Sequence, residues 1–185
     1  CKTLIKEDTY AAVYATSKPN EKAIVCILGT GSNCSYFDGK EIEQRVHSLG
    51  YVLMDEGSGN FFGKQLIRSY YFNSMPKDLA IKFENEYDLD ADIIKENIYR
   101  KENPNAYLAS FSKFLIKYKD NPVFQEIISK GLERFINHQI LQFDNAREVP
   151  IHFIGSISFY LKNEIKSALK LKGLEMGKIV QRPID

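Results

Sequence analysis

The sequence has few of the features that mark several large classes of protein. No apolar stretch among its 185 residues approaches the roughly 18 to 20 residues needed to span a bilayer. Its 25 basic and 24 acidic residues leave a net charge of +1, whereas nucleic-acid-binding proteins usually carry a basic surplus. No segment has the pattern of a signal peptide. We therefore expect a cytoplasmic protein whose partners are neither a membrane nor a nucleic acid.

Cysteine and histidine are too few and too scattered for the common metal sites. The cysteines are Cys1, Cys26 and Cys34, an odd number without paired spacing, which argues against a disulfide scaffold. Without a CxxC pair or a Cys/His cluster we expect no structural zinc, and we assign no residue as a metal ligand. Cys26 lies in an apolar run and is expected to be a small buried residue.

The patterns that are present indicate an α/β protein. The predicted elements are a helix at 7–16, a strand at 23–28, short strands up to Val46, a helix at 58–72, helices throughout 77–145, a strand at 151–155, a helix ending near 171 and a strand at 178–185. Helix starts are expected at Pro104 and Pro122. Together these elements predict a helical block at 73–149 between two α/β parts, at 1–72 and 150–185.

Three turns rich in small residues follow apolar runs and are candidates for ligand binding. They are Gly29 to Asn33, Asp55 to Gly59, and Gly155-Ser156. Backbone N–H groups in such turns can bind phosphate oxygens, and a helix N-terminus adds a favourable dipole. Taken singly, each turn can equally be a plain connection. Neither a GxxxxGK[ST] phosphate loop nor a GxGxxG dinucleotide fingerprint is present.

The order and spacing of the turns resemble those of the N-acetylglucosamine kinase and BadF/BadG/BcrA/BcrD ATPase-like family. The segments ILGTGSNCSYFDG, LGYVLMDEGSGNFFGKQLI and HFIGSISFYLKNEIKSAL carry this resemblance, which covers almost the whole chain. The family belongs to the sugar kinase, hexokinase, Hsp70 and actin superfamily. The resemblance implies an RNase H-like (actin-like ATPase) α/β domain with a helical insert. It also implies binding of ATP, Mg²⁺ and a small-molecule sugar, and a homodimer.

Asp8 corresponds to the aspartate of this family that contacts the sugar hydroxyls and acts as base on the hydroxyl that is phosphorylated. A positioned carboxylate can orient that hydroxyl and accept its proton. From the residues alone, a cap of the helix that follows is the favoured role of Asp8. One residue can do both.

The other roles that the resemblance implies fall on the three turns. The phosphate loop corresponds to Gly29, Thr30 and Gly31, and Thr30 would offer its hydroxyl and N–H to the ATP phosphates. The sugar-side positions correspond to Ser32, Asn33, Gly50 and Asp55. The adenosine motif corresponds to Gly155 and Ser156.

Several positions depart from the family pattern. Leu49 replaces a common aromatic sugar contact and Met54 replaces a glycine, which leaves the identity of the sugar open. The first phosphate loop of the family, a DGGGTKT-like turn whose aspartate organises Mg²⁺, does not occur in the sequence. The sequence also starts at Cys1 rather than Met. We therefore expect a fragment that lacks the N-terminal part of the two-domain fold and has little or no activity alone.

Three functions from different classes fit these motifs. The first is an ATP-dependent kinase, a transferase that phosphorylates an amino sugar such as N-acetylglucosamine. The second is a BadF-type activator ATPase of a dehydratase, which would hold an iron–sulfur cluster through cysteines. The third is a regulator that binds a sugar or nucleotide without catalysis.

Overall fold

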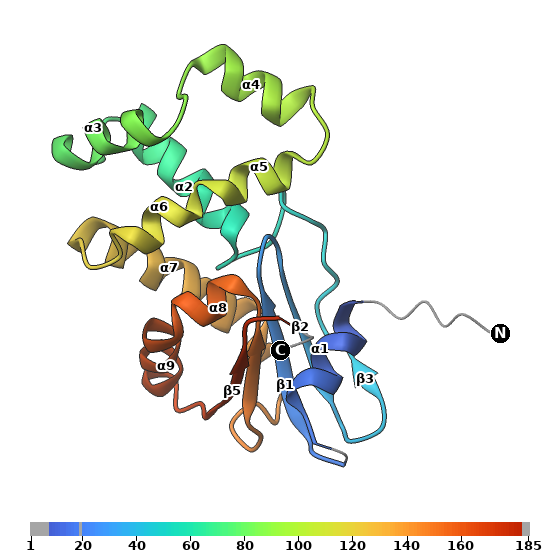
Figure 1. The fold of residues 1–185 in the computed structure, drawn as a ribbon. Helices are drawn as coiled ribbons and strands as arrows, with labels where there is room; N and C mark the ends of the chain where they lie inside the picture. The colour runs from blue at the N-terminus through green and yellow to red at the C-terminus, as the bar shows by residue number, and fades with distance from the viewer. Residues whose placement is uncertain (1–7, 19, 183–185) are drawn as a thin grey trace.

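The computed structural model describes residues 8–18 and 20–182. Its strands form one sheet in the order β3-β2-β1-β4-β5 (Figure 1). Strand β1 is antiparallel to β2 and parallel to β4, and β4 is parallel to β5. The strands are β1 (Ala23–Leu28), β2 (Ser32–Phe37), β3 (Ile42–Glu43), β4 (Ile151–Ile154) and β5 (Met176–Val180). The mixed sheet with its helices confirms the predicted α/β class.

Most helices lie between β3 and β4 in the sequence, and in Figure 1 they stand above one end of the sheet. The helices are α1 (Asp8–Thr16), α2 (Gly59–Tyr71), α3 (Lys77–Glu86), α4 (Ala91–Tyr99), α5 (Pro104–Ser110), α6 (Ser112–Lys117), α7 (Pro122–His138), α8 (Ser156–Tyr160) and α9 (Lys162–Leu171), with a 3-10 turn, η1 (Ile140–Gln142). None of the helices in the described ranges is long and apolar enough to cross a bilayer.

Local sequence explains where several helices begin. Pro104 and Pro122 occupy the first turns of α5 and α7, where the missing N–H of proline costs no hydrogen bond. The Asn121 side chain caps α7 by accepting a hydrogen bond from a first-turn N–H at 3.0 Å. Ser58 caps α2 in the same way, at 3.3 Å. The helix starts predicted at the two prolines are therefore confirmed.

The central strand β1 is apolar along its length because both of its faces are covered. Ile24, Cys26 and Leu28 belong to a large core that they share with α2, α7 and α9. Val25 belongs to a smaller core with the apolar side of α1. Cys26 is fully buried, as the sequence predicts.

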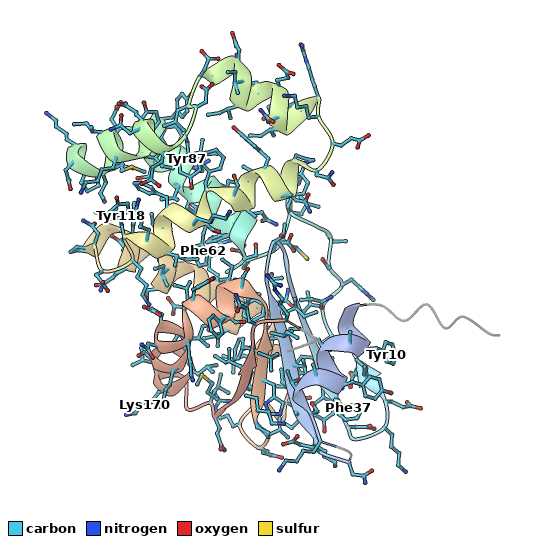
Figure 2. All side chains as sticks on the ribbon, viewed as in Figure 1. Tyr10, Phe37, Phe62, Tyr87, Tyr118 and Lys170 are labelled. Carbon is cyan, nitrogen blue, oxygen red and sulfur yellow. The ribbon has the colours of Figure 1, made fainter. Side chains whose placement is uncertain are left out.

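Aromatic rings fill the core of the helical part. The Phe83 ring lies 4.9 to 5.7 Å, between centroids, from the rings of Tyr87, Phe111 and Phe114. Tyr118 packs on Phe114 at 4.7 Å. Figure 2 shows Tyr87 and Tyr118 among these helices, away from the sheet. Phe111 and Phe114 lie three residues apart, the spacing of one helix face, and both are buried.

Helix α2 is packed so closely between α5 and α7 that two crossings need glycine. A Cβ added at Gly63 would lie 1.7 Å from the carbonyl oxygen of Leu108 in α5. A Cβ at Gly131 in α7 would lie 2.6 Å from the ring of Phe62, which Figure 2 labels. These close crossings fix the position of α2 relative to the other helices.

Three element boundaries differ from the prediction. The short strands expected to reach Val46 end at Glu43, because β3 pairs with β2 through only two residues. The region 77–145, predicted to be helical throughout, is divided by turns into α3 to α7 and ends in η1 and turns. The strand predicted at 178–185 begins at Met176 and ends at Val180, the residue that faces the last residue of β4. Its last three predicted positions lie outside the described residues.

His152 lies in β4 and is buried, with 2% of its surface exposed. Its Nδ1 accepts a hydrogen bond from the Lys178 N–H at 2.9 Å, and its Nε2 lies 3.6 Å from Oε2 of Glu21. Burial lowers the pKa of His152. The Glu21 carboxylate raises this pKa in part, and the Lys178 cation lowers it further. The folded protein therefore favours the neutral imidazole.

We expect the free energy of unfolding to decrease as the pH falls below about 6.5, the pKa of an unperturbed histidine. The folded pKa is lowered, so the unfolded chain binds the proton more tightly and acid favours unfolding. One such group changes stability by at most about 1.4 kcal/mol per pH unit. Urea unfolding between pH 5 and 8 measures this slope, and His152→Gln serves as the non-titrating control. Equal slopes for the two proteins would contradict the prediction.

Candidate functional site

The turn between β1 and β2, residues 29–31, has three backbone carbonyls, and all three accept hydrogen bonds. The Gly29 carbonyl accepts a hydrogen bond from the Gly59 N–H at 2.8 Å, and the Thr30 carbonyl accepts one from the Asn60 N–H at 3.0 Å. The Gly31 carbonyl accepts one from the Gly29 N–H at 3.0 Å. Within the described part of the chain, no acceptor engages the N–H groups of Thr30 or Gly31. Two successive free N–H groups in a turn can bind an anion.

This turn borders a pocket of about 300 Å³. One wall comes from the turn and the start of α2, a second from α5 and α6, and a third from the start of α8. This pocket is lined by Gly29, Thr30 and Ser156 together. All three are predicted to bind ATP, although Ser156 is far from the other two in the sequence. The walls also include Ser112 and Lys113 of α6, which the sequence analysis does not identify.

Gly155 explains how α8 comes close to the turn. A Cβ at Gly155 would lie 2.3 Å from the Leu28 carbonyl oxygen and 3.1 Å from the Gly29 nitrogen. Its φ of 120° is also a conformation that other residues rarely adopt. Gly155 therefore allows the β4–α8 connection to pack directly on the end of β1.

Asp55 joins three segments through its buried carboxylate. Its Oδ1 accepts a hydrogen bond from the Ser32 N–H at 3.3 Å, and its Oδ2 accepts one from Nδ2 of Asn60 at 2.8 Å. A Cβ at Gly31 would lie 2.8 Å from Oδ2. Asp55 as a residue is 7% exposed and has a φ of 71°. Asp55 thus holds the start of β2 and the start of α2 together.

Asn60 is a site residue that the sequence analysis missed. Its side chain is fully buried and binds Asp55. In the described part of the chain, neither its Oδ1 nor Oγ of the buried Ser32 has a hydrogen-bond partner. An amide in the first turn of α2, directly after the DEGSG turn and before two phenylalanines, is the signal that could have identified it.

A second polar group surrounds Asn33 on β2. The Asn33 Oδ1 accepts hydrogen bonds from the Cys34 N–H at 2.7 Å and from Nε2 of Gln44 at 3.2 Å. Nε2 of Gln44 also lies 3.5 Å from Oγ1 of Thr9 and 3.4 Å from Oγ of Ser35. Gln44 was not predicted, since a single glutamine after a short strand has no distinctive pattern.

The predicted base, Asp8, is the first residue of α1. Its side chain lies outside the described residues, so its role stays a prediction. Thr9, the next residue, is buried and reaches Asn33 through Gln44. The start of α1 therefore lies at the Asn33 end of β2.

Gly50 lies in the turn that leads to Asp55. It has a φ of 78°, and its carbonyl accepts hydrogen bonds from the N–H groups of Leu53 at 3.3 Å and Met54 at 2.8 Å. The side chain of Leu49 beside it is exposed. No hydrogen bond in the described ranges joins Gly50 to Asn33, so its sugar-side role stays a prediction.

The cysteines of the sheet do not form a cluster site. Cys26 and Cys34 face each other across β1 and β2, with their Sγ atoms 3.5 Å apart, and both are buried free thiols. Burial raises the pKa of the Cys26 thiol. In the ranges that the structure describes, no group of three His, Cys, Asp or Glu side chains could hold a metal ion. This arrangement gives no support to the iron–sulfur activator.

Comparison with known proteins identifies similar solved structures. One is a provisionally named N-acetylglucosamine kinase from Porphyromonas gingivalis, with a TM-score of 0.89 and 38% sequence identity over 94% of this chain and 61% of that chain. Another, a provisionally named N-acetylglucosamine kinase from Chromobacterium violaceum, has a TM-score of 0.70 and 17% identity over 92% of this chain and 60% of that chain. No protein-family model matches the sequence, and neither does any curated protein.

These matches first define the class of the protein, because the described fold is that of the actin-like sugar kinases. They also support a more specific conclusion. The resemblance to the N-acetylglucosamine kinase family that the turns predict is confirmed by the Porphyromonas gingivalis protein. The chain spans about three fifths of the length of the solved proteins it matches.

We expect Asn60→Ala to lower the free energy of unfolding by about 1.5 to 3 kcal/mol, because it removes a hydrogen bond to a buried carboxylate. Urea unfolding measures this change. Asn97→Ala is the matched control, since the Asn97 side chain donates to a backbone carbonyl on an exposed helix. Equal losses in the two variants would show that the Asn60–Asp55 bond is not important for stability.

We expect Gly155→Ala to destabilise the protein more than Gly173→Ala does. Both glycines have positive φ, but a Cβ at Gly173 meets no atom within 4 Å. Gly173→Ala should cost about 1 to 2 kcal/mol for its backbone conformation alone, and Gly155→Ala should add the clash with Leu28. Thermal unfolding of both variants tests this, and similar midpoints would refute it.

Proposed function

We propose that the complete protein containing this chain is an ATP-dependent sugar kinase that transfers the γ-phosphoryl group of ATP to a hydroxyl of an amino sugar such as N-acetylglucosamine. The observation that carries the proposal is the pair of free N–H groups at Thr30 and Gly31, beside a pocket that Ser156 also lines. The similarity to the Porphyromonas gingivalis protein supports it.

In this proposal the ATP phosphates bind the N–H groups of Thr30 and Gly31 and the hydroxyl of Thr30, and the adenosine lies against Gly155 and Ser156. Hydrogen-bond donors held in place by the protein stabilise the charge that develops during phosphoryl transfer. The described residues offer no cluster of acidic side chains for Mg²⁺. We propose that Mg²⁺ is held mainly by the ATP phosphates, whose charge it neutralises.

The sugar is proposed to bind on the other side of the same turn, near Ser32, Asn33, Gly50 and Asp55. The contact chain from Asn33 through Gln44 to the start of α1 supports this, because it places the beginning of the helix that carries Asp8 at this end of the sheet. Asp8 would orient the attacking hydroxyl and accept its proton. Each oxygen of Asp55 keeps a second acceptor position for a sugar hydroxyl.

The architecture proposed for the complete protein is an RNase H-like domain, with residues 73–149 as a helical insert between 1–72 and 150–185. The first phosphate loop would lie outside this chain. The chain alone is therefore proposed to be inactive or nearly so. The homodimer stays a prediction.

One observation favours a second function, a regulator that binds a sugar or nucleotide without catalysis. Both carboxylate oxygens of Asp55 already have partners inside the protein, Ser32 and Asn60. The exposed Leu49 also replaces an aromatic contact of the family. These two features reduce the number of groups in the site that can contact a sugar.

We expect the complete protein to form ADP from ATP in a sugar-dependent manner, measured by a coupled assay with a panel of hexoses and N-acetylated hexosamines. Asp8→Asn should lower kcat by about 10²- to 10⁴-fold, the usual contribution of a general base. Asp120→Asn, at an exposed position before α7, should leave kcat unchanged.

Two results would count against this scheme. Near-normal kcat in Asp8→Asn would reject Asp8 as the base. ATP binding without any sugar-dependent turnover would reject the kinase, and tight sugar binding in the same preparation would favour the regulator.

A further inference from the structure

One face of α5 and α6 lines the pocket beside the Thr30 turn. The backbone at Phe111 is helical, with φ −69° and ψ −22°, so α6 continues the direction of α5. Most of the lining positions follow the 3-4-3 spacing of a single helix face. Four of the lining residues, Ala106, Ala109, Lys113 and Ile116, have this spacing, and Ser110 and Ser112 beside them also line the pocket. The opposite face, with Leu108, Phe111, Phe114 and Leu115, is buried in the core.

This wall is attached to the rest of the site at two points. Near its middle, Ala109 and Ser112 lie so close to Gly59 that a Cβ there would be 3.1 Å from Cβ of Ala109. Just past the end of α6, Nζ of Lys119 donates to the Tyr160 carbonyl at 3.3 Å and pairs with Glu164 at 2.8 Å. The position of α6 relative to the turn and to α8 is therefore defined by direct contacts.

Lys113 is the charged residue among those that line this pocket. Its neighbour on α6, Lys117, forms an ion pair with Glu86, and Lys119 pairs with Glu164. Within the described ranges Lys113 has no such partner. Its positive charge is therefore uncompensated, on the side of the pocket formed by α6.

From this placement we propose that Lys113 binds the polyphosphate of the nucleotide from the α6 wall of the pocket that Thr30 also lines. The proposal rests on the nucleotide-binding part of the proposed function. A lysine ammonium carries three donors and a compact charge, which suit phosphate oxygens. The small side chains of Ala106 and Ala109 on the same face leave space for the ligand beside it.

Calorimetric titration of the complete protein without sugar tests this assignment. Lys113→Met should weaken binding of ATP and of ADP by about tenfold or more, since a charge-assisted hydrogen bond is lost. Binding of adenosine, which has no phosphate, should stay unchanged. Lys113→Arg should recover part of the ATP affinity because the charge is kept.

Lys117→Met is the matched control, because Lys117 lies one turn further on α6 and is also exposed. Its ATP affinity should stay within about twofold of the wild type, as expected for an exposed surface position. Unchanged ATP affinity in Lys113→Met would overturn the proposal. An equal loss of adenosine affinity would also overturn it, since that result would mean a change in the pocket rather than a lost phosphate contact.

The binding experiment separates this proposal from the kinase activity. Weaker ATP binding in Lys113→Met without sugar phosphorylation by the wild type would reject the kinase and retain Lys113 as a phosphate contact. Sugar phosphorylation by the wild type, together with normal ATP affinity in Lys113→Met, would retain the kinase and reject Lys113 as a phosphate contact. A complete protein that binds neither ATP nor ADP would reject both.

Discussion

The arrangement of the site depends on two hydrogen bonds, from the first N–H groups of α2 to the carbonyls of Gly29 and Thr30. N–H groups at a helix start need acceptors, and here the turn supplies them. Because the carbonyls of Gly29 and Thr30 point toward α2, the N–H groups of Thr30 and Gly31 are left free. The Asp55 carboxylate reinforces this arrangement by binding both Ser32 and α2. The fold thus stabilises the turn in a form that can accept an anion.

The helices between β3 and β4 contribute to both packing and the site. Aromatic and aliphatic residues on one face of α5 and α6 form the core, and smaller residues with Lys113 on the other face line the pocket. The glycine crossings of α2 keep α5 and α7 close to α2. Core packing therefore positions a wall of the pocket, and a change in that packing would move Lys113 relative to the turn.

Strong local patterns made much of the fold predictable. The apolar run of β1 and the prolines that start α5 and α7 each identify an element. The turns at Gly29 and Gly155 were found from their order and spacing. Asn60, Gln44 and Lys113 were missed because each is a single polar residue whose importance comes from what packs against it. The edge strands were mispredicted because their lengths depend on their pairing partners.

The sequence by itself determined which segments form helices, strands and small-residue turns, because those depend on local periodicity and backbone preferences. Tertiary structure alone decided which turns meet. Gly155 lies on Leu28 because β4 pairs with β1, a contact between distant parts of the chain that neither segment specifies locally. Lys113 lines the same pocket because the apolar face of its helix is buried in the core, and this burial determines the direction of the opposite face.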